Sequence, residues 1–257
     1  MENNLSLLMI TKNGQDTIEK SLLSVIKWVD EIVIIDDCST DNTIKKVKSL
    51  KLKVKSSNLK LKIFENREDD LGKQRMFGLQ KCSNNWVLVL DSDEVVSEKL
   101  KREIVTLLHC YIVKYEGFFI PFQNHYLGRG LKHGGESYKK LVLFKKDKVI
   151  IKPGLVNERF EMPSKKIETL KNKIYHHSYR SISQMYKKFT DYGVRNAKEK
   201  VRKGESTSLK KIFLYPLHMF WARFIKDKGY KDGLFRIPLD IGFAYMEFLS
   251  YFLMVFL

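Results

Sequence analysis

Four apolar runs separated by helix-patterned segments dominate the first hundred residues of this chain. The runs read LSLLMIT at residues 5–11, EIVIIDD at 31–37, LKIFEN at 61–66 and WVLVLDSD at 86–93. Runs of this kind, with little alternation between polar and apolar residues, are typical of parallel strands that are buried on both faces. This alternation of strands and helices predicts an α/β fold with a doubly wound sheet and right-handed crossovers.

The segments between the strands carry helix signals. Between the first two strands, Asp16 and Glu19 form a capping pair, and residues 18, 22, 25, 26 and 29 place apolar side chains on one helix face. The second connecting helix is expected to begin at a cap formed by Ser39 or Asp41.

Polar clusters follow three of the predicted strands. Thr11, Lys12 and Asn13 end the first strand and Asp36-Asp37 the second, while Asp91-Ser92-Asp93 follows the apolar run at residues 86–90. In open α/β sheets, ligands bind beyond the carboxyl ends of the strands. The three clusters are therefore expected to converge on one edge of the sheet.

The two aspartates of the third cluster suggest a metal site. Asp91 and Asp93 lie two positions apart, so in extended chain they share a face, where their charges repel unless a cation or strong donors lie beside them. Mg²⁺ or Mn²⁺, with phosphate oxygens completing its shell, suits such a DXD motif. The residues alone leave an alternative open, because acids also favour the first turn of a helix and Asp36-Asp37 also fits an Asx turn.

Composition indicates an anionic partner. Lys and Arg number 47 against 30 Asp and Glu, a formal net charge of +17. That charge suits a nucleotide, a phosphorylated glycan, a nucleic acid or a lipid headgroup. The three cysteines lack metal-ligand spacing and favour a reducing cytosol. Residues 237–257 are interrupted by Asp240 and Glu247, so we expect a helix that docks on the protein or lies on a membrane surface.

The domain boundaries follow from the change of pattern. Residues 118–180 mix short strands with Gly-rich turns, and helical periodicity returns from Ile182. We expect a catalytic domain at residues 1–180, with a nucleotide-binding half at 1–95 and an acceptor half at 96–180. Residues 181–257 are expected to form a helical, basic and aromatic C-terminal extension.

An ordered set of motifs resembles a known family. ITKNGQDTIEKSLLSV, EIVIIDDCSTDNT, LGKQRMFGL and WVLVLDSDE, in this order, resemble the family 2 glycosyltransferases of the GT-A fold. GKQRMFGL, YLGRGLKHGG, GLVNERFE and IYHHSYRSISQMYKKFTDY resemble more narrowly the branch of the lipopolysaccharide inner-core β-1,4-glucosyltransferases. The resemblance implies a GT-A, Rossmann-like mixed sheet with helices on both faces.

The resemblance also implies inverting transfer of a hexose, glucose favoured, from a UDP-sugar, with Mg²⁺ or Mn²⁺ as cofactor. It assigns Asp93 and His176 to the metal and Glu158 to the catalytic base, although Asn157 stands where the family's motif has His. Glu161 is the nearest competitor of Glu158, and a structural histidine or a surface salt bridge is the alternative at His176 and Glu158. The residues that it assigns to the nucleotide sugar are Thr11, Asn13, Asp36, Asp37, Arg75, Asp91 and Arg180.

The expected acceptor is an acidic glycolipid or oligosaccharide of a bacterial surface. His125, Arg129, Lys132 and His133 surround glycines in a loop that we interpret as facing it. The enzyme would be cytoplasmic, with peripheral contact at the inner face of the inner membrane, and no nucleic acid is expected. Two other classes remain at this stage: a sugar nucleotidyltransferase, which should carry a Gly-rich phosphate loop where TKNGQD has one glycine, and a basic nucleic-acid-binding protein.

Overall fold

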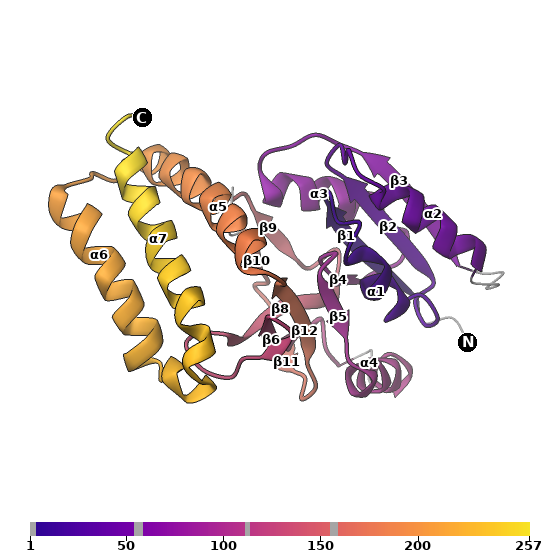
Figure 1. Ribbon diagram of the computed structural model, residues 1–257. Helices are drawn as coiled ribbons and strands as arrows, with labels where there is room; N and C mark the ends of the chain where they lie inside the picture. Colours follow the sequence, from indigo (N-terminus) through magenta and orange to yellow (C-terminus); the bar gives the residue numbers. More distant parts are fainter. Residues whose placement is uncertain (1–3, 54–58, 111–113, 155–158) are drawn as a thin grey trace. The chain divides into compact units, whose positions relative to one another are not determined.

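The computed structural model in Figure 1 describes residues 4–53, 59–110, 114–154 and 159–257. Contacts divide the chain into two compact units. Unit 1 contains residues 1–122 and 139–176, and unit 2 contains residues 123–138 and 177–257. The boundary after His176 lies close to the boundary that we expected at residue 180. Residues 123–138, which we expected in the acceptor half, group with the C-terminal helices instead.

Unit 1 holds most of the sheet. Its helices are α1 (Ile18–Leu23), α2 (Thr43–Lys53), α3 (Leu71–Lys81) and α4 (Glu98–Cys110). Its strands are β1 (Leu5–Thr11), β2 (Glu31–Asp36), β3 (Lys60–Glu65), β4 (Trp86–Val89), β5 (Glu94–Val96), β9 (Ile150–Lys152), β10 (Arg159–Glu161) and β11 (Ile167–Thr169). Three further strands, β6 (Gly117–Tyr126), β8 (Ser137–Lys145) and β12 (Ile174–Tyr179), contribute residues to both units.

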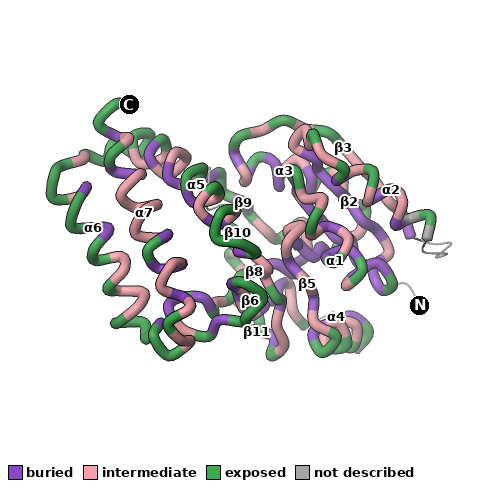
Figure 2. Tube along the Cα trace, in the orientation of Figure 1, coloured by how far each residue is buried: buried purple, intermediate pink, exposed green. Residues whose placement is uncertain are grey.

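The main sheet is mixed, with the strand order β3-β2-β1-β4-β8-β6-β12-β5. β3, β2, β1 and β4 run parallel, whereas β4 pairs antiparallel with β8, and β5 pairs antiparallel with β12. The four parallel strands are those that the sequence predicted, and β1 and β2 are buried almost throughout (Figure 2). The prediction of an α/β fold with a mixed sheet and a C-terminal helical extension is confirmed.

Helices cover both faces of the parallel strands. β1 to β2 and β2 to β3 are consecutive steps in one direction, so right-handed crossovers place α1 and α2 on the same face, and these two helices touch. The step from β3 back to β4 places α3 on the opposite face. Gly78 permits close packing there, because a Cβ atom at this position would lie 2.5 Å from Cδ1 of Leu8. The chain order reverses at β1, which lies between β2 and β4.

The expected cap of the first helix is wrong in detail. Thr17, not Asp16, is the N-cap residue, and its side chain makes no capping hydrogen bond. The reason is the preceding turn, in which the backbone N–H groups of Thr17 and Ile18 both donate to the carbonyl of Gly14. The apolar stripe is confirmed, since its five members are buried: Ile18, Leu22, Val25, Ile26 and Val29.

A buried carboxylate ties the amino-terminal ends of the strands together. Glu31 has no solvent exposure, and its carboxylate accepts hydrogen bonds from the Ser6 hydroxyl and, at 2.7 Å, from the Ser83 backbone N–H. The Lys62 ammonium lies 2.7 Å from the same carboxylate. Burial alone raises the pKa of Glu31, but the hydrogen bonds of Lys62, Ser6 and Ser83 outweigh it and lower the pKa.

Unit 2 is built around three helices. These are α5 (Ile182–Arg202), α6 (Leu209–Trp221) and α7 (Ile237–Leu253), and a short strand, β7 (Arg129–Gly130), pairs with β6. α7 lies between α5 and α6 (Figure 1) and packs against both. Gly242 allows the α5–α7 contact, because a Cβ atom there would lie 2.6 Å from the Phe189 ring. Among the described residues, no helix combines the length and the apolar character that a membrane crossing requires.

Ion pairs explain why residues 123–138 belong to unit 2. Arg236 is fully buried and donates from Nε and Nη2 to Asp240, each at 2.8 Å. Its Nη1 atom donates to the backbone carbonyl of His133 at 2.9 Å. Glu136, 1% exposed, pairs with Arg223 of the π-helical turn Ala222–Lys226. These contacts fasten the Gly-rich segment to the region between α6 and α7.

Candidate active site

The loop after β1 and the turn after β2 hold each other in place. The backbone N–H of Asp37 donates to the carbonyl of Thr11 at 2.8 Å, and the Asn13 N–H donates to the Ser39 hydroxyl at 2.8 Å. Asp36, which is buried, accepts from the backbone N–H and the hydroxyl of Ser39 at 2.9 and 2.6 Å. Asp36 therefore supports the turn, and the expected residues of the first two strand ends lie together.

Two polar side chains of this edge differ in their surroundings. Asp37 keeps 18% of its side chain exposed and pairs with the Lys12 ammonium at 2.8 Å. Thr11 is buried, and its hydroxyl has no hydrogen-bond partner within the described parts of the chain. Beside it, a Cβ atom at Gly14 would lie 2.8 Å from the Thr11 hydroxyl and 2.9 Å from that of Ser92. Gly14 therefore allows a close approach between Thr11 and Ser92, at the ends of β1 and β4, that a larger residue would disturb.

α3 places an arginine at the same edge. Asp70 caps this helix by accepting from the Lys73 backbone N–H at 3.1 Å, and one turn later Arg75 is only 4% exposed. Nη2 of Arg75 lies 2.6 Å from Oδ1 of Asp91. Burial by itself raises the pKa of Asp91, but the positive charges of Arg75 and Lys140 outweigh it and lower the pKa. Arg75 is therefore a buried partner of the acidic cluster and not a surface charge.

Strand pairing brings a histidine to the acidic cluster. β5 pairs with β12 so that Glu94 lies opposite His176, about eighty residues later in the chain. Nε2 of His176 lies 3.2 Å from Oδ1 of Asp93, and the two side chains are 14% and 21% exposed. The two residues expected to hold a metal are thus adjacent, partly open to solvent and both in unit 1.

Glu94 is a member of the cluster that the sequence analysis did not single out. It is 3% exposed, and one of its carboxylate oxygens accepts from the Asp91 backbone N–H at 2.8 Å. Burial, followed by the negative charge of Asp91, raises the pKa of Glu94 to about 7, against the opposing charges of His176 and Lys140. The available signal was the third acid of DSDE, which directly precedes two valines and so begins a buried strand.

The sequence analysis also did not single out Lys140, a positive charge near the acidic cluster. It lies on β8, which pairs with β4 next to the acidic segment. Its positive charge helps to lower the pKa of Asp91 and opposes the larger effects that raise the pKa of Glu94. In the sequence it is one of two adjacent lysines in a polar stretch, ESYKK, so nothing local separated it from a solvent-exposed charge.

Asp93 and His176 fit a divalent cation as a pair of ligands. Among the described residues, no group of three or more His, Cys, Asp or Glu side chains could hold a metal ion. Mg²⁺ and Mn²⁺ are nevertheless often held by one or two protein groups while phosphate oxygens and water complete the shell. A carboxylate and an imidazole 3.2 Å apart match that arrangement, and Asp91 is already paired with Arg75.

The expected base, Glu158, lies outside the described residues, but the chain on either side of it is anchored near α3. Before it, the Gly154 N–H donates to Asp70 at 3.0 Å. After it, the ring centroid of Phe160 lies 5.8 Å from the guanidinium carbon of Arg75. The competitor Glu161 pairs with Lys152 at 2.9 Å on the two-stranded sheet formed by β9 and β10.

Residues of the remaining predictions belong to unit 2. Arg180 is exposed, and its backbone N–H donates to the Gln184 side chain at 3.1 Å at the start of α5. His133 bonds to Asp232 at 2.8 Å, and Arg129 stacks on the Phe235 ring at 4.9 Å. The roles of these side chains toward donor or acceptor stay predictions.

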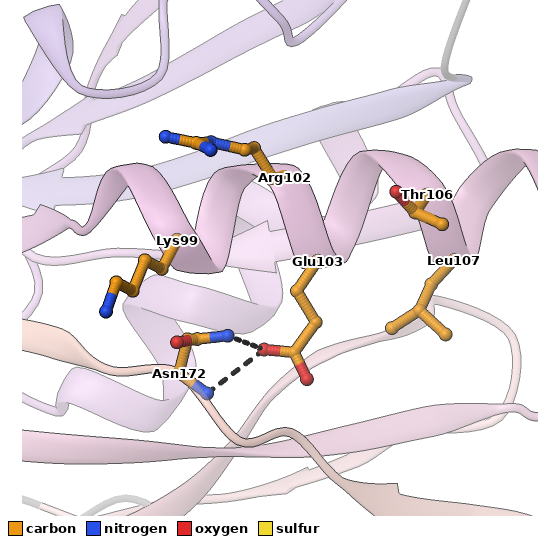
Figure 3. A pocket seen from close by; sticks show the side chains of 6 residues that line it. All are labelled: Lys99, Arg102, Glu103, Thr106, Leu107 and Asn172. Carbon is orange, nitrogen blue, oxygen red and sulfur yellow. Dashed lines mark hydrogen bonds between the residues drawn. The ribbon is translucent and has the colours of Figure 1, made fainter.

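A hollow on the surface of unit 1 is not part of this cluster. It lies along α4 (Figure 3), and Glu103 at its centre accepts from the side chain of Asn172 at 2.8 Å. Asn172 precedes β12, whose Ile174 pairs with Val96. The hollow therefore lies toward the opposite end of the β5–β12 pair from Asp93 and His176. Its lining residues are Lys99, Arg102, Glu103, Thr106, Leu107 and Asn172.

Comparison with known proteins identifies the domain that carries the cluster. Residues 6–113 match the sequence model of the family described as Glycosyl transferase family 2. This segment is a family 2 glycosyltransferase domain. An uncharacterized glycosyltransferase of Rickettsia typhi is 26% identical over 272 residues, which cover 95% of this chain and 84% of the relative.

Two further similarities concern TarS of Staphylococcus aureus. TarS is named a poly(ribitol-phosphate) β-N-acetylglucosaminyltransferase. It is 29% identical to this chain over 108 residues, which cover 40% of this chain and 18% of TarS. The crystal structure of TarS residues 1–349 with UDP has 17% identity and a TM-score of 0.48, and the match covers 98% of this chain and 89% of that one. The family match decides against the sugar nucleotidyltransferase that the acidic strand ends also allowed.

Proposed function

We propose that this glycosyltransferase transfers a hexose, glucose favoured, from a UDP-sugar to an acidic glycan of a bacterial surface, with inversion at the anomeric carbon. One observation carries the proposal: Asp37 follows β2, and Asp91 and Asp93 follow β4, on either side of β1 in a family 2 domain. Arg75 pairs with Asp91, and His176 lies beside Asp93. Such an edge is where open α/β sheets bind their ligands.

The uridine is proposed to bind at the ends of β1 and β2. The buried Thr11 hydroxyl, the side chain of Asn13 and the partly exposed carboxylate of Asp37 supply polar groups there. Asp36 acts indirectly by holding the Ser39 turn. Asp91, whose charge Arg75 stabilises, would accept from the ribose or from a metal-bound water.

The diphosphate is proposed to meet Asp93 and His176 through Mg²⁺ or Mn²⁺. When bound, the metal supplies positive charge to the leaving diphosphate. His176 lies 3.2 Å from the Asp93 carboxylate, so both side chains could reach the same ion. Arg180 is proposed as a further donor, because a guanidinium matches phosphate geometry in a bidentate way.

The acceptor hydroxyl needs a base as it attacks the anomeric carbon, and Glu158 is the proposed base. The anchoring of Gly154 to Asp70, and of Phe160 against Arg75, supports this assignment, because both contacts hold neighbours of Glu158 near the helix that carries Arg75. Glu161 is less suited, since Lys152 already neutralises it.

A lipopolysaccharide core or a related phosphate-bearing glycan is the proposed acceptor. The net charge of +17 favours an anionic acceptor. The name of TarS states that this relative acts on poly(ribitol-phosphate), which is also a phosphate-bearing polymer. The basic loop with Arg129 and Lys132 is the proposed contact surface for such an acceptor.

A panel of UDP-sugars with and without Mn²⁺ tests the proposal. We expect one UDP-hexose to be consumed in the presence of an acidic glycolipid acceptor by the wild-type enzyme, and not by Asp93→Asn or Glu158→Gln. Calorimetry should show that UDP binding is weakened in Asp93→Asn and retained in Glu158→Gln. Failure of the wild-type protein to bind UDP at millimolar nucleotide would overturn the proposal.

A further inference from the structure

The outer face of α6 carries a row of exposed apolar side chains. The row continues into the following π-helical turn and repeats every fourth residue, so each member is a neighbour of the next along the helix surface. The exposed fractions are 75% for Leu209, 60% for Phe213, 67% for Leu217, 49% for Trp221 and 46% for Ile225. Figure 2 shows α6 as a largely exposed or partly exposed trace.

This exposure is unusual for a helix at the edge of a folded unit. The opposite side of α6 already packs on α7, through buried residues such as Ile212 and Pro216. A surface helix with one buried face normally presents polar residues on the other. A continuous apolar row on the second face therefore indicates an interaction surface.

Charge narrows the choice of partner. No acidic residue occurs between Glu205 and Asp227, whereas Lys210, Lys211, Arg223 and Lys226 all fall within that stretch. Arg223 is used inside unit 2, in its pair with Glu136. Lys210 is exposed at one end of the row, and Lys226, Lys228 and Lys231 are exposed at the other.

We propose that the row Leu209, Phe213, Leu217, Trp221 and Ile225 is a membrane-docking surface that binds an anionic lipid bilayer. The apolar side chains would enter the boundary between headgroups and acyl chains, while the lysines at both ends contact lipid phosphates. A second copy of the chain fits less well, because symmetric pairing of this face would bring the lysines of the two ends together, and these outnumber the exposed acid Asp227. Lipid binding requires no sugar donor, so this inference stands apart from the proposed transfer.

For residues 237–257, the structure favours docking on the protein over contact with a membrane. Residues 237–257 were expected to dock on the protein or on a membrane, and most of this segment forms α7, which packs between α5 and α6. Leu239 and Asp240 are fully buried there, and Tyr251 is 5% exposed. α7 also exposes Ile241 and Phe252, at 47% and 40%, but the row on α6 is longer and more exposed.

The tryptophans provide a direct reporter. The chain has three, of which Trp28 and Trp86 are 7% and 3% exposed and Trp221 is 49% exposed. With phosphatidylglycerol vesicles, the emission of the full chain should shift to shorter wavelength and become protected from acrylamide. Trp221→Phe should lose the shift, and phosphatidylcholine vesicles should bind more weakly.

Flotation of the full chain with phosphatidylglycerol vesicles tests the surface by substitution. Leu217→Glu should weaken binding by roughly tenfold or more, as should Lys210→Glu combined with Lys226→Glu. The matched control is Leu52→Glu, an equally drastic change on α2 at a side chain that is 84% exposed. Circular dichroism and UDP binding should be the same for all variants.

Two outcomes would overturn the inference. One is equal binding of Leu217→Glu and Leu52→Glu to the anionic vesicles. The other is a wild-type dimer in sedimentation that Leu217→Glu converts to a monomer, with no vesicle binding by either, which would assign the face to self-association. Because UDP binding is measured on the same variants, failure of lipid docking stays distinguishable from failure of the proposed transfer.

Discussion

Nη2 of Arg75 lies 2.6 Å from Oδ1 of Asp91, and this pair joins the helix after β3 to the acidic segment after β4. The guanidinium is nearly buried, whereas the carboxylate keeps 30% of its side chain exposed. One end of the pair is therefore fixed by the core, and the other faces the sheet edge where a nucleotide sugar would bind.

Replacing Arg75 by Leu should reduce both stability and activity. The change leaves Asp91 without its main positive partner, and removing one member of a largely buried pair costs about 2–3 kcal/mol in the free energy of unfolding. Urea denaturation measures the loss, and UDP titration should show weaker binding. Arg102→Leu, at an exposed arginine of α4, is the control and should alter neither quantity.

Asp93→Asn and His176→Gln should each raise the Mn²⁺ concentration needed for half-maximal activity, by about tenfold or more, because each removes one of two proposed protein ligands. Direct Mn²⁺ binding in the presence of UDP, followed by electron paramagnetic resonance, should weaken in parallel. Asp147→Asn, an exposed acid in the turn after β8, serves as control. Unchanged metal dependence in both site variants would contradict the assignment.

Glu158→Gln should reduce kcat by about 10²–10⁴-fold, the usual contribution of a general base, while leaving UDP affinity unchanged. Glu161→Gln should have little effect on transfer, since Lys152 already pairs with that carboxylate. Single-turnover transfer and UDP calorimetry on the two variants separate chemistry from binding. A larger loss in Glu161→Gln than in Glu158→Gln would reverse the two assignments.

Glu31 should make stability depend on pH in the acidic range. Its pKa is lowered in the folded chain, so its ionised form contributes stability that is fully present above the unfolded pKa of about 4.3 and is lost as pH falls through the folded value. Glu31→Gln should therefore be less stable than wild type at pH 7, and the difference should shrink below about pH 4. Urea unfolding at both pH values measures this, and a difference that is independent of pH would contradict it.

The buried pair of Arg236 and Asp240 gives a fifth prediction. Arg236→Met should destabilise unit 2 by about 3–5 kcal/mol, because it leaves buried carboxylates unpaired. Adding Asp240→Leu should recover part of the loss, since the second change removes one of those carboxylates. Thermal unfolding of the single and double variants tests this, with Arg202→Met, at the exposed end of α5, as control.

The sequence by itself determined the parallel half of the sheet and the position of its acidic edge. The apolar runs before Thr11, Asp36 and Asp91 are long and uninterrupted, so their burial and direction follow from local pattern and from the handedness of crossovers. The family motifs lie in the same segments, which is why Asp93 could be assigned before any contact was known.

Only the tertiary structure decided which distant groups complete that edge. Three features depend on strand partners that lie about fifty to eighty residues away: the pairing of His176 with Asp93, the charge of Lys140 near the acids, and the raised pKa of Glu94. The local hydrophobic pattern of a strand does not specify which distant strand it pairs with. The same reason applies to unit 2, where α6 and α7 are both rich in apolar residues. Packing alone decided that much of α7 is covered and that Leu217 and Trp221 on α6 remain exposed.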